Sequence, residues 1–355
     1  MKKRIGCIIC CLFLFLWLPG CTKEYERYRG EFYGTFDTVV TIVGYVQKES
    51  DFDRYTSYAQ ERFQYFHQLF DRYDVYDGVV NIKTINDQAG IGPVKVSEDL
   101  FEFLQYCLDW CEKSEGKVNV ALGPVLEIWH TYRERYENAA EGELPAQEAL
   151  EQANLLTDWT KVELDEEEQT VFLPEKGMSL DVGAIAKGYT TEKVGQELFE
   201  MGFTSFSISA GGNVRTFSAP ASADRSKWNI SIMNPHTAED PDAQPIDFLY
   251  LNDLSVVTSG DYQRYYLADG KKIHHIIDPA TLYPADYYQS VTVVTQDSGE
   301  GDLLSTWLFT LPLEQAKAVA QQYGAEALWV LQDDTVVYTD GYLDYSKNYG
   351  GATLE

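Results

Sequence analysis

Apolar residues recur every three or four positions in several segments, which is the spacing of one buried face of an α-helix. In residues 55–70 the pattern is carried by Tyr55, Tyr58, Phe63, Phe66 and Phe70. Residues 100–111 are more strongly apolar, and Ser97 is a suitable N-cap because acidic residues follow it in the first turn. Similar patterns predict helices over 185–199, 302–311 and 313–323.

Short runs rich in β-branched residues alternate with these helices and predict strands. The predicted strands cover 35–43, 205–209, 228–232, 255–258, 290–295, 327–331 and 335–338. Two acidic stretches, 137–145 and 237–245, indicate surface loops. Helices and strands in this order, without an internal repeat or a long linker, predict a single mixed α+β body.

The first residues have the pattern of a secretory signal. Lys2, Lys3 and Arg4 precede an apolar run that ends in Leu18-Pro19-Gly20-Cys21. A cysteine at the cleavage point is typical of a lipoprotein, so we expect lipidation of Cys21 at the extracytoplasmic face of the cell membrane. The run is too short for a standard transmembrane helix, and an uncleaved anchor is the alternative. The predicted parts are a signal peptide (1–20), a lipidated, Tyr-rich tether (21–34), a folded domain (35–345) and a C-terminal tail (346–355).

The amino-acid composition of the chain limits the kinds of ligand that the protein can bind. The chain is 45% hydrophobic and 24% charged, which is enough apolar material for a sizeable core. Its net charge of −28 argues against nucleic acid or anionic lipid, because phosphate backbones are bound by Lys and Arg. An anionic ligand would therefore need a local device such as a helix N-terminus or a metal ion. Cys107 and Cys111 share one helix face and are interpreted as buried thiols.

Four segments contain residues suited to chemistry. Asp181 to Tyr189 reads as a strand end, a turn at Gly183 and a helix carrying Lys187, which suits an anion unless Lys187 is merely a surface side chain. Gly211-Gly212 allows a close backbone approach to a ligand or a neighbouring strand, or else forms a simple tight turn. Adjacent His274 and His275 on a strand would face opposite sides, so one at most lines a given site. Asp302 and Thr306, four apart on a helix, offer hard oxygen ligands for Mg²⁺, or else are an incidental helix start.

The order of these segments resembles that of the FAD:protein FMN transferase family, the ApbE-type lipoproteins. The resemblance runs from about residue 35 to residue 311. It rests on eight segments in the same order, which are Phe36 to Ile42, Phe70 to Asp74, Ser114 to Asn119 with Gly123-Pro124 and Trp129, Asp181 to Tyr189, Gly211-Gly212, Thr258 to Tyr262, His275 to Pro279, and Asp302 to Thr306. The resemblance implies the T-fold-like architecture of these transferases.

The family moves FMN from FAD to a Thr or Ser hydroxyl of a target protein, releases AMP and uses Mg²⁺. By resemblance, the metal ligands are the Ala184 carbonyl, Asp302 and Thr306, and Lys187 contacts the FAD phosphates. Flavin- or adenine-contacting positions correspond to Phe36, Tyr73, Asp74, Val75, Asn119 and Ile277. His275 corresponds to a histidine tied to turnover, and either it or a carboxylate beside the metal would accept the hydroxyl proton. The implied acceptors are extracytoplasmic electron-transfer proteins.

Three departures from the family pattern lie on the expected FAD side. Asn119 stands where an Asp is usual, Val118 and Ala121 replace an aromatic and a hydroxyl residue, and Phe36-Asp37 replaces a common Met-Gly pair. The metal pair and the lysine are retained, so we expect catalysis to survive. Two other functions stay open at this point: an FAD pyrophosphatase giving FMN and AMP, and a flavin-binding lipoprotein without turnover.

Overall fold

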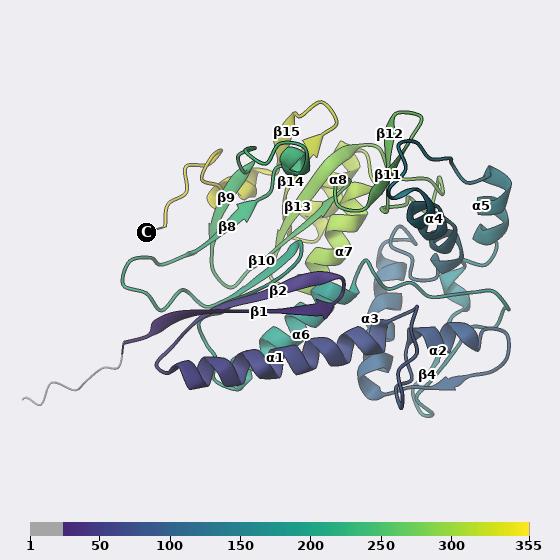
Figure 1. The fold of residues 1–355 in the computed structure, drawn as a ribbon, viewed down its shortest axis with the longest axis horizontal. Coiled ribbons are helices and arrows are strands. Elements are labelled where there is room, and N and C mark those ends of the chain that lie inside the picture. Colours follow the sequence, from purple (N-terminus) through teal and green to yellow (C-terminus); the bar gives the residue numbers. More distant parts are fainter. Residues whose placement is uncertain (1–23, 355) are drawn as a thin grey trace, which may run out of the picture.

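The computed structural model describes residues 24–354, and its centre is an eight-stranded antiparallel sheet (Figure 1). The strand order is β1-β2-β6-β7-β10-β13-β14-β15. These strands are β1 (Glu26–Thr35), β2 (Thr38–Val46), β6 (Phe206–Ala210), β7 (Asn213–Phe217), β10 (Ser255–Gly260), β13 (Tyr288–Thr295), β14 (Glu326–Leu331) and β15 (Val336–Tyr338). Chain segments far apart in sequence thus become neighbours, since β2 pairs with β6 and β10 lies between β7 and β13.

Helices cover one face of this sheet. They are α1 (Glu49–Phe70), α6 (Ala186–Glu200), α7 (Ser298–Phe309) and α8 (Leu313–Gln322). α3 (Glu98–Lys113) packs on this helix layer, where Phe103 contacts Phe70 of α1 and Tyr189 of α6. Val291 and Val293 of β13 pack in the same core cluster as Leu303 and Leu304 of α7. The alternating side chains of a strand point to opposite faces, so Val291, Val293 and Thr295 define the face of β13 that α7 covers.

The opposite face is covered by a hairpin and a late segment of the chain. β8 (Trp228–Ile232) pairs with β9 (Asp247–Leu251), and the 3₁₀ helix η3 (Asp340–Asp344) lies beside them. Val256, Val294 and Tyr342 belong to this second cluster. Both faces of the sheet are therefore buried at its centre, where all eight residues of β13 are buried.

A third group of elements lies at one end of the sheet, on the right of Figure 1. It comprises α2 (Ile82–Asp87), β3 (Val94–Lys95), α4 (Gly123–Tyr136), α5 (Gln147–Asn154), η1 (Trp159–Lys161), β4 (Glu163–Asp165), β5 (Thr170–Phe172), β11 (Tyr265–Ala268) and β12 (Lys271–His274). Trp129 of α4 donates a hydrogen bond from Nε1 to the Leu282 carbonyl at 2.8 Å, which ties α4 to the segment after β12. The remaining 3₁₀ helix, η2 (Pro235–Ala238), follows β8.

The predicted mixed α+β body is confirmed, and the helices predicted from their apolar periodicity are present. The Ser97 side chain does cap α3, accepting a hydrogen bond from the Leu100 amide. The expected tether is wrong from Glu26 onward, because these residues form the edge strand β1 and pair with β2 along their length. The expected tail is also built into the body, since Ser346 is buried and the Lys347 amide donates to the Phe248 carbonyl at 2.9 Å.

The predicted signal peptide (1–20) and Cys21 lie outside the described residues. Among residues 24–354 no helix is both long and apolar enough to cross a membrane.

Candidate active site

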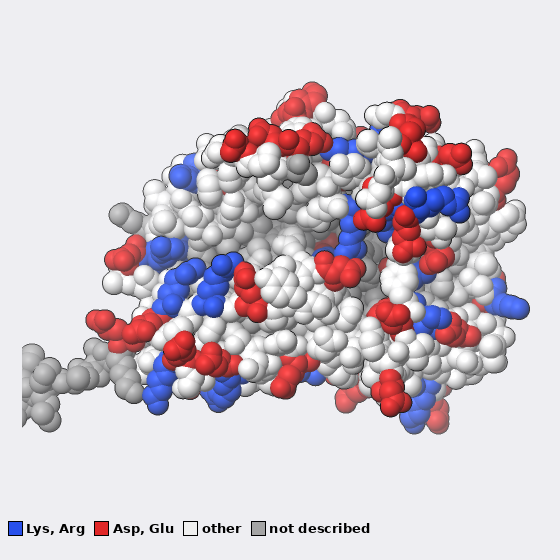
Figure 2. All heavy atoms as spheres, viewed as in Figure 1, with Lys and Arg blue, Asp and Glu red and all other residues white. Residues whose placement is uncertain are grey.

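A cavity of about 700 Å³ opens where the helix layer meets α4 and the segment around β11 and β12. Figure 2 shows basic and acidic side chains close together in the middle of the molecular face that is turned toward the viewer. The walls come from the β1–β2 turn, the end of α1, the start of α6, the end of β10 and the inner side of α7. A cavity of this size is within the usual range for cofactors and small ligands.

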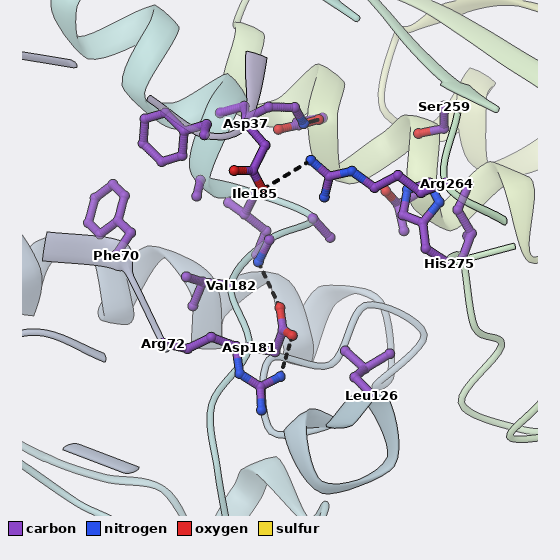
Figure 3. Close-up of a pocket in the computed structure, with 18 of the residues that line it drawn as sticks. Asp37, Phe70, Arg72, Leu126, Asp181, Val182, Ile185, Ser259, Arg264 and His275 are labelled. Carbon is purple, nitrogen blue, oxygen red and sulfur yellow. Dashed lines mark hydrogen bonds and ion pairs between the residues drawn. The ribbon is translucent and has the colours of Figure 1, made fainter. Parts of the chain in front are cut away.

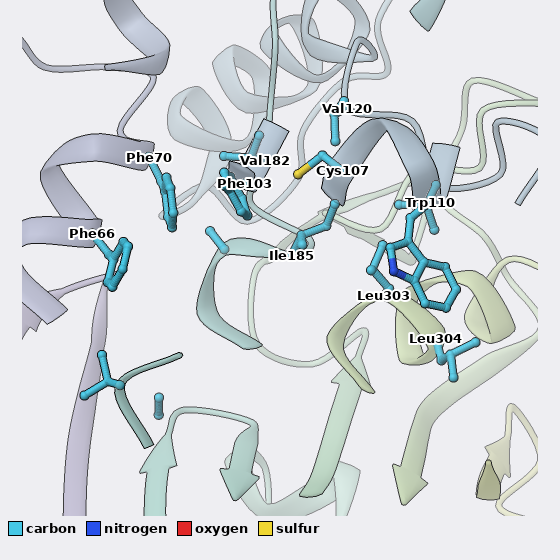
Figure 4. Packing of buried hydrophobic residues seen from close by; sticks show 14 of the residues in the cluster. Phe66, Phe70, Phe103, Cys107, Trp110, Val120, Val182, Ile185, Leu303 and Leu304 are labelled. Carbon is cyan, nitrogen blue, oxygen red and sulfur yellow. The ribbon is translucent and has the colours of Figure 1, made fainter. Parts of the chain in front are cut away.

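The floor of the cavity is continuous with the hydrophobic core. Phe70, Val182 and Ile185 line the cavity and also belong to the main core cluster (Figures 3 and 4). Phe70 stacks on Phe103 of α3 with ring centroids 3.8 Å apart. The apolar packing therefore holds the polar groups of the site on a rigid base.

The Gly183 turn is anchored by the carboxylate of Asp181. Its Oδ1 accepts a hydrogen bond from the Gly183 amide at 2.9 Å, and its Oδ2 lies 2.5 Å from Nη1 of Arg72. Figure 3 shows this Arg72–Asp181 pair, and the Arg72 side chain, only 9% exposed, also pairs with Glu127. This arrangement fixes the chain just before α6, where the Ala186 amide donates to the Val182 carbonyl at 2.9 Å and the Gly188 amide to Asp302.

Asp302 of α7 meets the first turn of α6. Its side chain is almost completely buried, Oδ2 accepts a hydrogen bond from the Gly188 amide at 2.8 Å, and Oδ1 lies 3.6 Å from Nζ of Lys187. Thr306, one turn further along α7, and Ala184 line the same cavity. The structure thus brings together the residues expected to bind metal and phosphate.

The donor set suits Mg²⁺ rather than a softer metal. Ala184, Asp302 and Thr306 would offer a carbonyl, a carboxylate and a hydroxyl, which are hard oxygen ligands. Among residues 24–354 no cluster of three His, Cys, Asp or Glu side chains could hold a metal by itself. A cation here would therefore take its remaining ligands from phosphate oxygens or water, as Mg²⁺ commonly does.

The two adjacent histidines have different roles. His274 is packed: Nε2 donates to the Ala285 carbonyl at 2.7 Å and Nδ1 accepts from the Ile276 amide. His275 lines the cavity, and its Nδ1 is buried without a hydrogen-bond partner in the described chain. Burial, with nearby Arg264 as the next cause, holds the pKa of His275 well below its usual value, so the ring is neutral at pH 7.

Most residues expected to contact flavin or adenine lie in the cavity wall. Phe36, Tyr73, Asp74, Asn119 and Ile277 do so. Val75 does not: its side chain is 72% exposed and is not part of the lining.

Two hydrogen bonds hold the Asn119 side chain in the cavity wall. Its Nδ2 donates to the Thr157 carbonyl at 2.9 Å and its Oδ1 accepts from the Ala121 amide at 2.8 Å.

Sequence reasoning missed the arginines of the site. Arg264, which follows β10, lies 3.6 Å from Asp37 in the β1–β2 turn and bridges the cavity mouth (Figure 3). Arg133 of α4 also lines the cavity, and burial together with Arg264 lowers its pKa. No spacing along the chain links these residues, because they come from three separate elements.

Fold and cavity together define an α+β protein with a deep, mixed polar and apolar site for a small ligand. The model of the ApbE family matches residues 36–329, and the chain belongs to this family. The predicted resemblance is thereby confirmed.

Curated relatives and solved structures agree with this assignment. An FAD:protein FMN transferase from Treponema pallidum is 34% identical over 276 residues, covering 74% of each chain. One from Klebsiella pneumoniae is 35% identical over 277 residues, covering 76% of this chain and 82% of its own. The ApbE protein of Thermotoga maritima superimposes with a TM-score of 0.78 at 27% identity, over 89% of this chain and 98% of that one. A flavinyl transferase ApbE from Pseudomonas stutzeri, at 21% identity and a TM-score of 0.73, shows the same fold over 93% of this chain and 98% of its own.

Proposed function

We propose that this protein is an FAD:protein FMN transferase that moves FMN from FAD to a Thr or Ser hydroxyl of another protein and releases AMP with the help of Mg²⁺. The observation that carries the proposal is the meeting of Asp302, Lys187 and the first turn of α6 at one end of the cavity. In a protein of net charge −28, this is the kind of local device that an anionic dinucleotide requires.

The residues that line the cavity fall into one group that would bind the diphosphate and another that would bind the cation. The Lys187 ammonium would hold the diphosphate, while Asp302, Thr306 and the Ala184 carbonyl would hold the cation. Bound there, Mg²⁺ would offset the charge that develops on the transferring phosphoryl group. Phe36, Tyr73 and Ile277 offer apolar surface for the flavin or adenine rings.

The proton of the attacking hydroxyl needs an acceptor. His275 lines the cavity and its Nδ1 has no hydrogen-bond partner within residues 24–354, so this ring is one acceptor available to the hydroxyl, although burial lowers its pKa and weakens it as a base. The Asp302 carboxylate is the alternative acceptor. The nucleophile comes from the acceptor protein, and water in its place would make the enzyme an FAD pyrophosphatase.

The proposal extends to location. The N-terminal lipoprotein pattern, which ends at Cys21, supports lipid anchoring at the outer face of the cytoplasmic membrane. Acceptors would then be extracytoplasmic flavinylated electron-transfer proteins reached from the membrane surface.

The test combines FAD, an acceptor with a hydroxyl-bearing segment, and Mg²⁺ or EDTA. We expect metal-dependent AMP and flavin fluorescence on the denatured acceptor, both reduced at least about a hundredfold in Asp302→Asn. Asp247→Asn is the matched control, because Asp247 is equally buried and hydrogen-bonded but lies under η3 on the other face of the sheet. It should cost stability and leave turnover per folded molecule unchanged.

Two other outcomes of this assay would support a different function. AMP with only free FMN would favour the pyrophosphatase. FAD recovered intact under every condition would overturn both enzymatic functions and leave a flavin-binding protein.

A further inference from the structure

Asn213, the first residue of β7, has a buried donor that the fold does not use. The residue is 1% exposed and lines the cavity, yet its Nδ2 has no hydrogen-bond partner within residues 24–354. A buried amide without a partner destabilises the fold, so its retention calls for an explanation. Its backbone is already paired with Ala210 and Val257, so strand pairing does not require this side chain.

The strand register shows which way the side chain points. Asn213 lies directly opposite Val257, and opposite residues of an antiparallel pair share a face. Val257 faces α7, because a Cβ built on Gly301 would come within 2.7 Å of its Cγ2. Ser259, two residues further on the same face, is bonded through Oγ to Ser305 of α7 at 2.8 Å. Asn213 therefore faces α7, the helix that carries Asp302.

The neighbouring residues place this face at the junction of α6 and α7. Arg215, two residues along β7 from Asn213, binds Glu192 of α6 in a bidentate pair. Glu192 in turn accepts a hydrogen bond from the Ser298 amide at the start of α7. Arg215 is thus satisfied by the fold, whereas Asn213 on the same face is not.

The turn before Asn213 is open to the cavity. Gly211 and Gly212 line it together with Thr258 and Ser259. A Cβ on Gly212 would come within 2.6 Å of the Thr258 carbonyl, so this turn depends on glycine for its close approach to β10. The sheet therefore presents a rigid wall with one unpaired donor beside the Asp302 end of the site.

We propose that Nδ2 of Asn213 donates a hydrogen bond to a phosphate oxygen of the bound dinucleotide. The inference rests on the proposed function, since FAD supplies the diphosphate. A neutral amide adds a donor beside Asp302 without adding a cation that would compete with a metal for that carboxylate. Lys187 approaches from α6 and Asn213 from the sheet, so the diphosphate is held from two sides.

The test measures affinity and stability in the full chain kept in detergent. FAD, ADP and riboflavin are titrated in the presence of Mg²⁺, and thermal unfolding is recorded without ligand. Asn213→Ala should bind FAD and ADP about tenfold to a hundredfold more weakly, keep its affinity for riboflavin, and unfold at the same or a higher temperature. Asn213→Asp, which replaces the donor with a charge, should bind both phosphorylated ligands more weakly still.

Ser290→Ala is the matched control. Ser290 is a buried residue of β13 whose Oγ also has no partner within the described part of the chain, but it does not line the cavity. It should match Asn213→Ala in unfolding temperature and match the wild type in every affinity.

Unchanged FAD and ADP affinities in both Asn213 variants would overturn the inference, as would a lowered unfolding temperature with retained affinities. An equal loss of riboflavin affinity would place the contact on the flavin ring and overturn it as well. A wild-type chain that binds FAD but transfers no flavin would refute the proposed transfer, while the affinities would still decide the role of Asn213. A wild type that binds neither FAD nor ADP would overturn both.

Discussion

The carboxylate of Asp302 caps the first turn of a helix other than its own. Its Oδ2 accepts the Gly188 amide of α6 at 2.8 Å, although the two residues are 114 positions apart. The first amides of a helix have no partner within the helix, so this bond satisfies one of them and fixes the spacing of α6 and α7. One carboxylate oxygen therefore serves the fold, while the other faces Lys187.

Gly188→Ala should separate these two helices. A Cβ at this position would lie 2.2 Å from the Ser298 carbonyl oxygen and 2.6 Å from Cβ of Asp302, and a rigid carbonyl cannot move aside cheaply. We expect a loss of about 1–3 kcal/mol in the free energy of unfolding, measured by urea denaturation. Gly92→Ala is the control, because a Cβ there meets nothing within 4 Å, and equal stability of the two variants would contradict the prediction.

Asn119→Asp should destabilise this protein. The Asn119 Nδ2 donates to the Thr157 carbonyl, and a carboxylate oxygen in its place would face that carbonyl without a proton between them. We expect a cost of about 1–3 kcal/mol at pH 7. A double variant that also changes the acceptor side is not possible, because Thr157 contributes its backbone. The comparison is therefore with Asn119→Ser, which should cost less; a gain in stability for Asn119→Asp would refute this account.

The parts of the site that sequence predicted are those that lie within a few residues of each other. Asp302 and Thr306 share a face because of helical spacing, and Gly183 with Lys187 forms a turn leading into a helix. The pairing of Arg264 with Asp37 joins segments more than 200 residues apart, so no local pattern indicates it.

The exposed edge of the sheet explains why the first strand is not predicted from sequence. β1 is an edge strand with most of its residues exposed, so its charged sequence resembles that of a tether. Only Phe32 and Thr35 of β1 are buried, and the stacking of Tyr28 on Phe52 is a tertiary contact. At the centre, β13 is buried on both faces and shows no alternation, yet its β-branched residues were sufficient to predict it.

Asp37→Gly should stabilise the protein. Phe36 and Asp37 both have positive φ, 51° and 52°, in the two-residue turn between β1 and β2, where such turns favour Asn-Gly or Asp-Gly. Glycine adopts this conformation without strain, and the ion pair lost to Arg264 is exposed and contributes little. We expect a gain of about 0.5–1 kcal/mol, measured by thermal unfolding. Asp37→Val is the opposite control and should be less stable than wild type; a lower stability for the glycine variant would show that the ion pair outweighs the strain.

Acid should destabilise the protein through His274. Burial lowers the pKa of His274 to about 4, whereas an unfolded histidine has a pKa near 6.5. Between these values the unfolded chain binds more protons than the folded one, so stability is full above about pH 6.5 and falls as the pH drops toward 4. From pH 7 to pH 5 this residue alone should remove roughly 2 kcal/mol.

His274→Gln tests this assignment, because glutamine does not titrate. The variant should be less stable at pH 7, where it loses the bonds to Ala285 and Ile276, but its further loss between pH 7 and pH 5 should be smaller than that of the wild type. His236→Gln gives the opposite sign, since the hydrogen bond to Asp334 raises the pKa of that exposed histidine and its contribution is lost as the pH rises. Urea titrations at both pH values supply the comparison. An identical acid loss in His274→Gln and wild type would assign the acid sensitivity to other groups, with the buried His275 as the next to examine.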